Sequence, residues 1–172
     1  MCVIIWSPRG EIPKKHVLTA MLYHQDGWGF AVPTKHGIST YRSVDHKHFL
    51  TAWVNRLRGP VLFHARWATH GKVCKANCHP FQVRRHKLVA AHNGVIHGFG
   101  SNNKSDTKHF IEEVIEPLPP RFHEEEAIMA SLEDLLGSNK MVLLHHSGSA
   151  TILNERLGVW KGGCWYSNTT AF

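Results

Sequence analysis

Apolar and polar residues follow two different periods along this chain. Short apolar runs rich in β-branched residues predict buried strands, and the first of them covers residues 2–6. Apolar residues that recur every three or four positions predict amphipathic helices instead. This helical spacing occurs at residues 17–22, 49–57, 110–115 and 128–136. The pattern therefore predicts a mixture of helices and strands.

Further strands are expected between and after these helices. Turn signals such as Asp26-Gly27 separate them, and the C-terminal part should form short antiparallel strands. The predicted strands are residues 28–32, 37–42, 61–63, 88–91, 140–145, 150–153, 158–161 and 164–167. Helices before and between strands, with antiparallel strands at both ends, predict an α+β fold of two stacked sheets flanked by helices.

Length and composition limit how the chain can be organised. Its 172 residues suffice for one domain with a sizeable core, so we expect a single domain over residues 1–172. The sequence does not begin with a basic segment and a long apolar stretch, and it has no span long enough to cross a membrane. We therefore expect a cytoplasmic protein with no membrane partner, in which the four cysteines need not form disulfides.

The net charge of +7 is compatible with an acidic partner, including nucleic acid. The basic residues are scattered, however, and the densest group, residues 84–87, lies between two apolar runs. Such a group is typical of a solvated hairpin turn. Charge by itself therefore leaves nucleic-acid binding as an alternative only.

The most informative segment is residues 64–71, His-Ala-Arg-Trp-Ala-Thr-His-Gly, which directly follows the apolar run 61–63. Arg and His are seldom placed beside a core unless something binds or pairs with them. A strand-end turn with one salt-bridged Arg would also explain the segment. Its chemistry therefore has to be judged together with the motifs that follow.

A metal site is one alternative for this loop. His70, Cys74, Cys78 and His79 are spaced loosely like zinc ligands. Cys78 and His79 are adjacent, however, and adjacent residues can seldom both turn toward one ion. We therefore expect neither a metal nor a cofactor.

The ordered set of motifs resembles a known family. Residues 64–71 are followed by Asn-Cys-His-Pro (77–80), His-Asn-Gly (92–94) and Ser-Asp-Thr (105–107), and a cysteine stands at position 2. This set resembles the glutaminase domain of the class II glutamine amidotransferases, a branch of the N-terminal nucleophile (Ntn) hydrolases. The resemblance covers about two thirds of the chain. It implies a four-layer αββα sandwich of two mainly antiparallel sheets flanked by helices.

The resemblance makes Cys2 the nucleophile. A small side chain at position 2 favours removal of Met1, and the new N-terminus then carries both a thiol and an amine. That amine has an ordinary pKa near neutrality, so it can act as the base for its own thiol, directly or through a water. The alternative for Cys2 is a small apolar residue in a buried strand.

Asn93 and Gly94 match the residues that form the oxyanion hole in this family. Attack on an amide carbonyl places negative charge on oxygen, and catalysis needs donors that already point at that oxygen. Asn93 offers a side-chain amide and Gly94 a backbone N–H. An Asn-Gly turn that closes a β-hairpin is the alternative.

The resemblance also implies how substrate is bound. Arg66 matches the residue that binds the α-carboxylate of glutamine, and a guanidinium can form two parallel bonds to a carboxylate. Trp67 would belong to the loop that closes over glutamine, with Thr69 and His70 lining its pocket. Asp106 matches the anchor of the α-amino group. Residues 105–107 would also suit the start of a helix.

Some positions depart from the family pattern. The segment between Gly94 and Asp106 is shorter than in most relatives, so we expect the helix usual there to be missing. Lys108 stands where an acidic residue is common, and Val3 replaces a Gly. Asp26 is open between an ordinary Asp-Gly turn and an element that lies near the nucleophile in relatives.

The function implied by the resemblance is release of ammonia from L-glutamine. Cys2 would form a thioester that water hydrolyses to glutamate, and a separate synthase partner would consume the ammonia. Compact single-domain members occur in bacteriophages, which is compatible with a phage source and the host cytoplasm. Two alternatives keep the fold, namely an amidohydrolase for a γ-glutamyl conjugate, or a catalytically silent basic module that binds nucleic acid or a partner protein.

Overall fold

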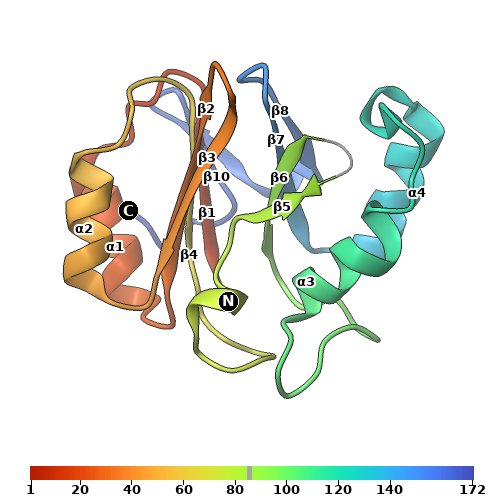
Figure 1. Cartoon of the computed structure of the whole chain (residues 1–172), viewed down its shortest axis with the longest axis horizontal. Coiled ribbons are helices and arrows are strands. Elements are labelled where there is room, and N and C mark those ends of the chain that lie inside the picture. The colour runs from red at the N-terminus through yellow and green to blue at the C-terminus, as the bar shows by residue number, and fades with distance from the viewer. Residues whose placement is uncertain (85–86) are drawn as a thin grey trace.

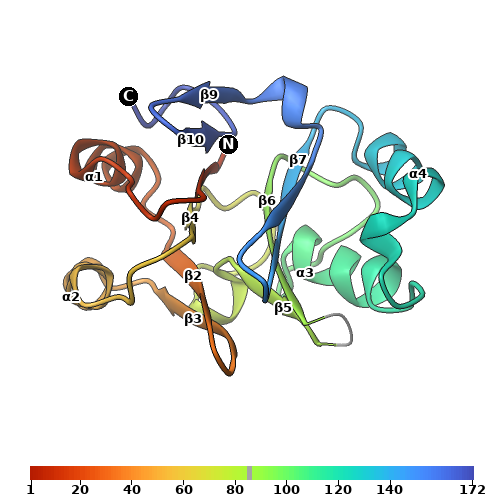
Figure 2. The same ribbon diagram turned by 90° about the horizontal axis from the view of Figure 1, so that it is seen from above.

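The computed structural model describes residues 1–84 and 87–172 as two antiparallel β-sheets packed face to face (Figure 1). Helices cover both outer faces, as the view from above shows (Figure 2). These layers confirm the predicted α+β sandwich. Arg85 and His86, from the basic group predicted to form a solvated hairpin turn, lie outside the described residues.

The first sheet contains six strands in the order β3-β2-β4-β1-β10-β9, and neighbouring strands run antiparallel. The strands are β1 (Val3–Ser7), β2 (Trp28–Thr34), β3 (Gly37–Ser43), β4 (Val61–Ala65), β9 (Val159–Lys161) and β10 (Cys164–Tyr166). β1 is an inner strand, with Ile5 opposite both Phe63 of β4 and Tyr166 of β10. This pairing secures the start of the chain on both sides.

The second sheet contains four strands in the order β5-β6-β7-β8, also antiparallel. They are β5 (Phe81–Val83), β6 (Leu88–Asn93), β7 (Lys140–His145) and β8 (Ala150–Leu153). Alternate residues of both sheets face inward, as expected for period-two strands. The layer between the sheets consists of Ile4, Trp6, Ala31, Leu62, Val89, Ala91, Val142, Leu144 and Trp165.

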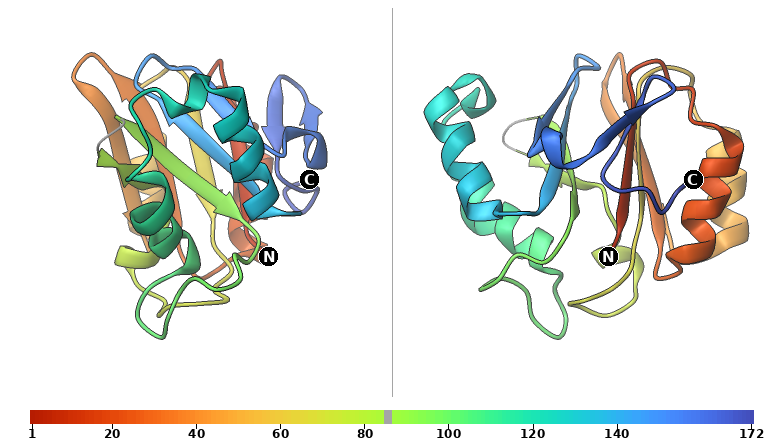
Figure 3. Two further views of the ribbon diagram at one scale, coloured as in Figure 1. Left: turned by 90° about the vertical axis from the view of Figure 1, so that its right-hand side faces the viewer. Right: turned by 180° about the vertical axis from the view of Figure 1, so that it is seen from behind.

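Helices lie outside each sheet, as the view from behind also shows (Figure 3). α1 (Lys14–Tyr23) and α2 (His46–Val54) pack on the first sheet. α3 (Asp106–Phe110), the π-helical turn that continues it (Ile111–Ile115) and α4 (Glu126–Leu136) pack on the second. Short 3₁₀ turns occur at Lys75–Asn77, Phe122–Glu124 and Glu155–Leu157.

The apolar stripe of α1 is narrower than predicted. Val17 and Met21 are buried, but Leu18 is 41% and Leu22 65% exposed. Only the side chains that point at the outer face of the first sheet are covered, since nothing packs on the far side of this short helix. As expected, no helix forms between Gly94 and α3. Within the described ranges, no helix is both long and apolar enough to cross a membrane.

Candidate active site

Three strand ends meet at one end of the sandwich. β1 begins beside the end of β4, because Val3 pairs with Ala65, and β6 of the facing sheet ends nearby. Figure 1 shows the N-terminus at the same end of the molecule as the loops that follow β4 and β6. A small hollow there is lined by Cys2, Arg66, Trp67, Thr69, His70, His79, His92, Gly94, Ser105, Asp106 and Thr107. Every site residue predicted from the sequence lines it, except Asn93.

Cys2 is buried at the base of this hollow. Its Sγ accepts a hydrogen bond from the Trp67 amide at 3.4 Å and lies 3.5 Å from the Trp67 carbonyl oxygen, to which the thiol donates. Burial raises the pKa of the Cys2 thiol to about 11, although the Trp67 amide opposes the shift. Asn168 holds the Cys2 carbonyl through its side-chain amide at 2.8 Å. The thiol is therefore neutral at physiological pH, so a nucleophilic role requires a nearby base.

Arg66 is 3% exposed and stabilises the loop to which it belongs. Its Nη2 donates to the carbonyls of His70 at 2.7 Å and Gly71 at 3.3 Å, and its Nη1 donates to the carbonyl of Lys72 at 3.2 Å. The charged fork thus orders the loop around the hollow. The salt-bridged turn considered from the sequence is wrong, because these partners are carbonyls rather than a carboxylate.

Asp26 contacts this loop from the turn before β2. Its Oδ2 accepts a hydrogen bond from the Ala68 amide at 2.7 Å, and its own amide donates to the Arg66 carbonyl at 3.1 Å. Sequence reasoning left Asp26 open between an ordinary turn and an element near the nucleophile. The two contacts place it beside the loop that holds Cys2.

The Asn93-Gly94 turn does not close a hairpin. β6 pairs with β5 and β7, and β7 begins only at Lys140, so the hairpin alternative is wrong. Gly94 has φ +142°, and a Cβ there would collide with the Asn139 side chain. Asn139 fixes the turn, because its Oδ1 accepts from the Val95 amide at 2.7 Å and its Nδ2 donates to the Val95 carbonyl at 3.0 Å.

Asn93 itself is buried behind the hollow. Its Nδ2 donates to Ser167 Oγ at 2.8 Å, and this hydroxyl also accepts from the Ile4 amide at 2.8 Å. Asn93 Oδ1 has no hydrogen-bond partner in the described part of the chain. Sequence reasoning missed both Asn139 and Ser167, because neither belongs to a motif and both are far from residue 93 in the chain.

Asp106 lies at the start of α3, where its carboxylate has two backbone partners. Oδ2 accepts from the Ile96 amide at 2.8 Å, and Oδ1 accepts from the Thr107 amide at 2.7 Å. Ser105 caps the helix by accepting from the Lys108 amide at 3.3 Å. The segment therefore begins a helix, as its sequence predicts, and also presents Asp106 to the hollow.

Three buried histidines, His64, His79 and His92, meet at the hollow, which the last two also line. His64 Nε2 lies 3.1 Å from the His92 carbonyl oxygen and 2.7 Å from His79 Nδ1. Burial lowers the pKa of all three imidazoles, that of His92 to about 4. His64 was not singled out from the sequence. Its position two residues after the inward-facing Leu62 of β4 was the available signal.

Comparison with known proteins identifies the family. No family model matches the chain. The glutamine–fructose-6-phosphate aminotransferase [isomerizing] of Halalkalibacterium halodurans is 31% identical over 143 residues, covering 74% of this chain and 23% of the relative. That of Bacillus licheniformis is 28% identical over 172 residues, covering 88% and 28%.

Solved structures match the fold over nearly the whole chain. They include the glutamine phosphoribosylpyrophosphate amidotransferase of B. subtilis, with a TM-score of 0.61 and 14% identity. A structure of the allosteric regulatory enzyme of purine biosynthesis has a TM-score of 0.62 and 16% identity. Each match covers 96% of this chain and 41% of the other. The chain belongs to the class II glutamine amidotransferases.

This class II amidotransferase domain spans about a quarter of the length of the curated relatives that it matches. The comparisons give no support to the nucleic-acid binding that the sequence left open. The relatives and neighbours are named aminotransferases and amidotransferases. The comparisons therefore establish the fold and the family of this chain.

The zinc alternative has no suitable geometry in this amidotransferase domain. Cys78 Sγ donates to the Cys74 carbonyl at 3.4 Å, and His79 faces His64. Across residues 1–84 and 87–172, no three His, Cys, Asp or Glu side chains are arranged to hold a metal ion. All four cysteines are free thiols.

Proposed function

We propose that this domain hydrolyses the side-chain amide of L-glutamine and releases ammonia, with Cys2 as the nucleophile. The observation that carries the proposal is the position of Cys2, which lies at the start of β1 in the hollow that Arg66 and Asp106 also line. A thiol beside a cationic and an anionic group suits an amide substrate that also carries an amino-acid backbone.

The mechanism begins with proton removal from Cys2. Because burial raises the thiol pKa, the amine exposed on Cys2 by removal of Met1 is the proposed base. The thiolate attacks the side-chain carbonyl, and the amine passes the proton to the leaving nitrogen, which departs as ammonia. Water then hydrolyses the γ-glutamyl thioester to glutamate and regenerates the thiol. A chain that keeps Met1 lacks this amine and should be inactive.

Negative charge on the carbonyl oxygen needs donors during both steps. We assign this role to the Gly94 amide, which lines the hollow, and to the Asn93 side chain behind it. Gly94 has no side chain, and a Cβ there would collide with the Asn139 side chain. Asn139, directly before β7, holds this turn in place through its bond to the Val95 amide.

Arg66 and Asp106 are the proposed readers of the α-carboxylate and α-amino groups. Both are buried and already ordered by backbone partners, so substrate would join an existing set of hydrogen bonds. Trp67, Thr69 and His70 are the proposed remaining walls of the pocket, and all three are exposed on the loop side. Such an arrangement favours a free amino acid over a peptide-linked amide.

The ammonia acceptor is proposed to lie outside this domain. The matched relatives are named aminotransferases and are several times longer than the matched region, so in them glutamine use is coupled to a second reaction. We propose a synthase partner, or a synthase domain, that receives ammonia from this hollow.

The test is release of glutamate and ammonia from L-glutamine by protein whose N-terminus has been checked by intact mass. Turnover should disappear in Cys2→Ala and persist in Cys164→Ala, a matched loss of another buried thiol. Undiminished turnover by Cys2→Ala would show that Cys2 is not the nucleophile. If a γ-glutamyl conjugate is turned over much faster than glutamine, the conjugate rather than glutamine is the substrate.

A further inference from the structure

A second, larger hollow lies at the opposite end of the sandwich from Cys2. Its volume is about 500 Å³. It lies between the β2–β3 end of the first sheet and the β5–β6 end of the second. β2 runs from Trp28 near the active site to Thr34 near this hollow, and β6 runs from Leu88 at the hollow to Asn93. The two sites therefore share strands but no lining residues.

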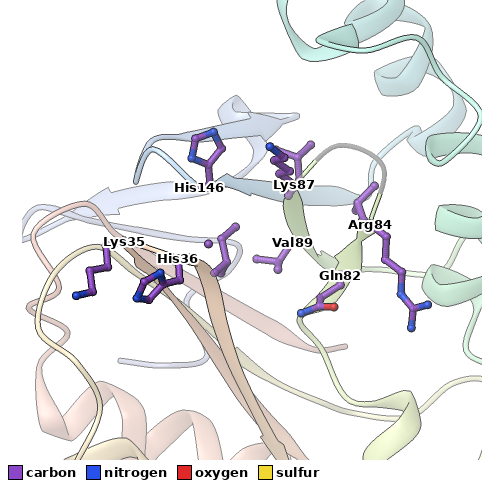
Figure 4. A pocket seen from close by; sticks show the side chains of 11 residues that line it. Lys35, His36, Gln82, Arg84, Lys87, Val89 and His146 are labelled. Atoms are coloured by element: carbon purple, nitrogen blue, oxygen red, sulfur yellow. The ribbon is translucent and has the colours of Figure 1, made fainter.

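Basic side chains from three separate turns surround this hollow. Lys35 and His36 come from the β2–β3 turn, Arg84 and Lys87 flank the β5–β6 connection, and His146 follows β7. Figure 4 shows them around the central Val89, although the Arg84 guanidinium and the Lys35 ammonium both point away from it. Among the described residues that line the hollow, none is acidic.

The wall between these basic groups is apolar. Leu88 and Val89 are 3% and 1% exposed, and Val83 is fully buried. Ile38 of β3 completes this wall from the facing sheet. A ligand there would meet positive charge at the rim and the half-buried Ile38 within, above a floor of almost fully covered apolar side chains, a mixture that is usual in small-molecule sites.

Ion pairs to these basic side chains are missing among the described residues, although the Glu116 carboxylate accepts a hydrogen bond from the Arg84 amide at 2.7 Å. Across the described chain, Lys35, Arg84 and Lys87 take part in no ion pair, and their side chains have no hydrogen-bond partner. Elsewhere on the surface, by contrast, Lys104 pairs with Glu112. Unpaired like charges around one hollow raise the local potential and concentrate multivalent anions.

We propose that this hollow binds a small organic phosphate, with the phosphate among the basic side chains of its rim, which include Lys35 and Lys87, and the apolar part against Ile38. Its volume lies within the ~300–1,000 Å³ of typical small-molecule pockets. Turns on three sides enclose it, which favours a compact ligand over an extended acidic peptide. The site is distinct from the proposed glutaminase site and does not depend on that activity.

The test is titration calorimetry on the full chain with phenyl phosphate, inorganic phosphate and a hexaglutamate peptide as probes. Phenyl phosphate should bind more tightly than inorganic phosphate, because only the former reaches the apolar wall. The variant Lys35→Gln/Lys87→Gln should weaken phenyl phosphate binding by about 10-fold or more, since both proposed charged contacts to the phosphate are lost.

The matched control is Lys14→Gln/Lys15→Gln, which removes the same charge from exposed positions on α1. It should change affinity less than about twofold at moderate salt. Equal weakening in both double variants would overturn the proposal in favour of net charge alone. Equal affinity for phenyl phosphate and inorganic phosphate would overturn the apolar contact, and tighter binding of hexaglutamate would indicate a protein partner instead.

Discussion

At the scale of single residues, the side-chain amide of Asn93 is the most informative case. Ser167 Oγ accepts hydrogen bonds from both Asn93 Nδ2 and the Ile4 amide, so its own hydrogen points elsewhere. Turning the amide by 180° would let Ser167 donate to Oδ1, which otherwise has no partner among the described residues. Asn93 Nδ2 would then be free to donate to the substrate oxygen. Ser167 thereby becomes a positioning residue for the proposed oxyanion hole.

Ser167→Ala should therefore lower kcat by about 10-fold, less than the ~100-fold expected for loss of an oxyanion donor itself. KM should change little, because Ser167 lies behind the hollow and does not line it. Steady-state kinetics with L-glutamine measure both constants, and Ser167→Thr, which keeps the hydroxyl, should recover most of kcat. A raised KM with unchanged kcat would contradict this role.

Arg66→Ala should raise the KM for glutamine by roughly 10- to 100-fold, the usual cost of a lost charge-assisted pair. Its effect should exceed that of Arg66→Lys, which keeps the charge but not the planar fork. The loop carbonyls that Arg66 holds would also lose their donors, so some loss of kcat is expected. An unchanged KM in Arg66→Ala would remove this residue from the substrate pocket.

The sequence predicted which residues would gather at the site, but not all of their contacts. Motif residues such as Arg66 and Asp106 were expected to share one pocket, and both line it. The carbonyl partners of Arg66 depend on the path of the loop, which residue types do not determine. The same applies to Ser167 and Asn139, whose closeness to Asn93 arises only when distant strands pair.

At the scale of elements, the spacing of apolar residues predicted the positions of the strands better than it predicted which helix side chains are buried. The runs that became β1, β4 and β6 were recognised because buried β-branched residues have few other uses. Strand order was not predictable, since β1 lies between β4 and the C-terminal β10. The same order brings Ser167, just after β10, next to the start of β1.

β2 offers an element-scale prediction at Gly29. A Cβ at this position would collide with the carbonyl oxygens of His79 and Tyr41, which are backbone atoms that cannot turn aside. Gly29→Ala should separate β2 from the His79 segment and lower the free energy of unfolding by about 2 kcal/mol or more. Urea unfolding measures the loss.

Gly37→Ala is the comparison for this variant. Nothing lies within 4 Å of a Cβ at Gly37, although φ there is +130°. It should lose stability only through backbone strain, about 1 kcal/mol, so Gly29→Ala should be the more damaging change. A larger loss of stability in Gly37→Ala than in Gly29→Ala would show that the His79 segment can shift away from β2 at little cost.

At the scale of the whole molecule, the two sheets extend from the Cys2 hollow at one end to the basic hollow at the other. Periodicity alone predicted helices and strands, and the resemblance supplied the four-layer arrangement that the structure confirms. β2 and β6 each reach from the Cys2 end to the basic hollow, so the same strands position both sites. The inward-facing layer that joins the sheets is apolar along most of its length, except where the histidines replace apolar side chains near Cys2.

These buried histidines should make the whole fold sensitive to acid. Burial lowers the pKa of His64 and His79 well below the ordinary 6.5, and that of His92 and His145 to about 4. Between these values and pH 6.5, the unfolded chain binds protons that the folded chain excludes. Stability is therefore complete above pH 6.5 and falls as the pH decreases, by up to ~1.4 kcal/mol per pH unit for each fully buried histidine.

Urea unfolding from pH ~7.5 to ~5 should show this loss before most carboxylates titrate. His145 provides the internal control, because it is distant from Cys2 and bonds Thr151 Oγ1 at 2.8 Å through Nε2. His145→Gln should reduce the slope of stability against pH by about one proton, whatever its effect on stability at neutral pH. Constant or increasing stability down to pH ~5 would mean that the three-histidine cluster accepts protons in the folded state, so that the layer beneath Cys2 is open to water.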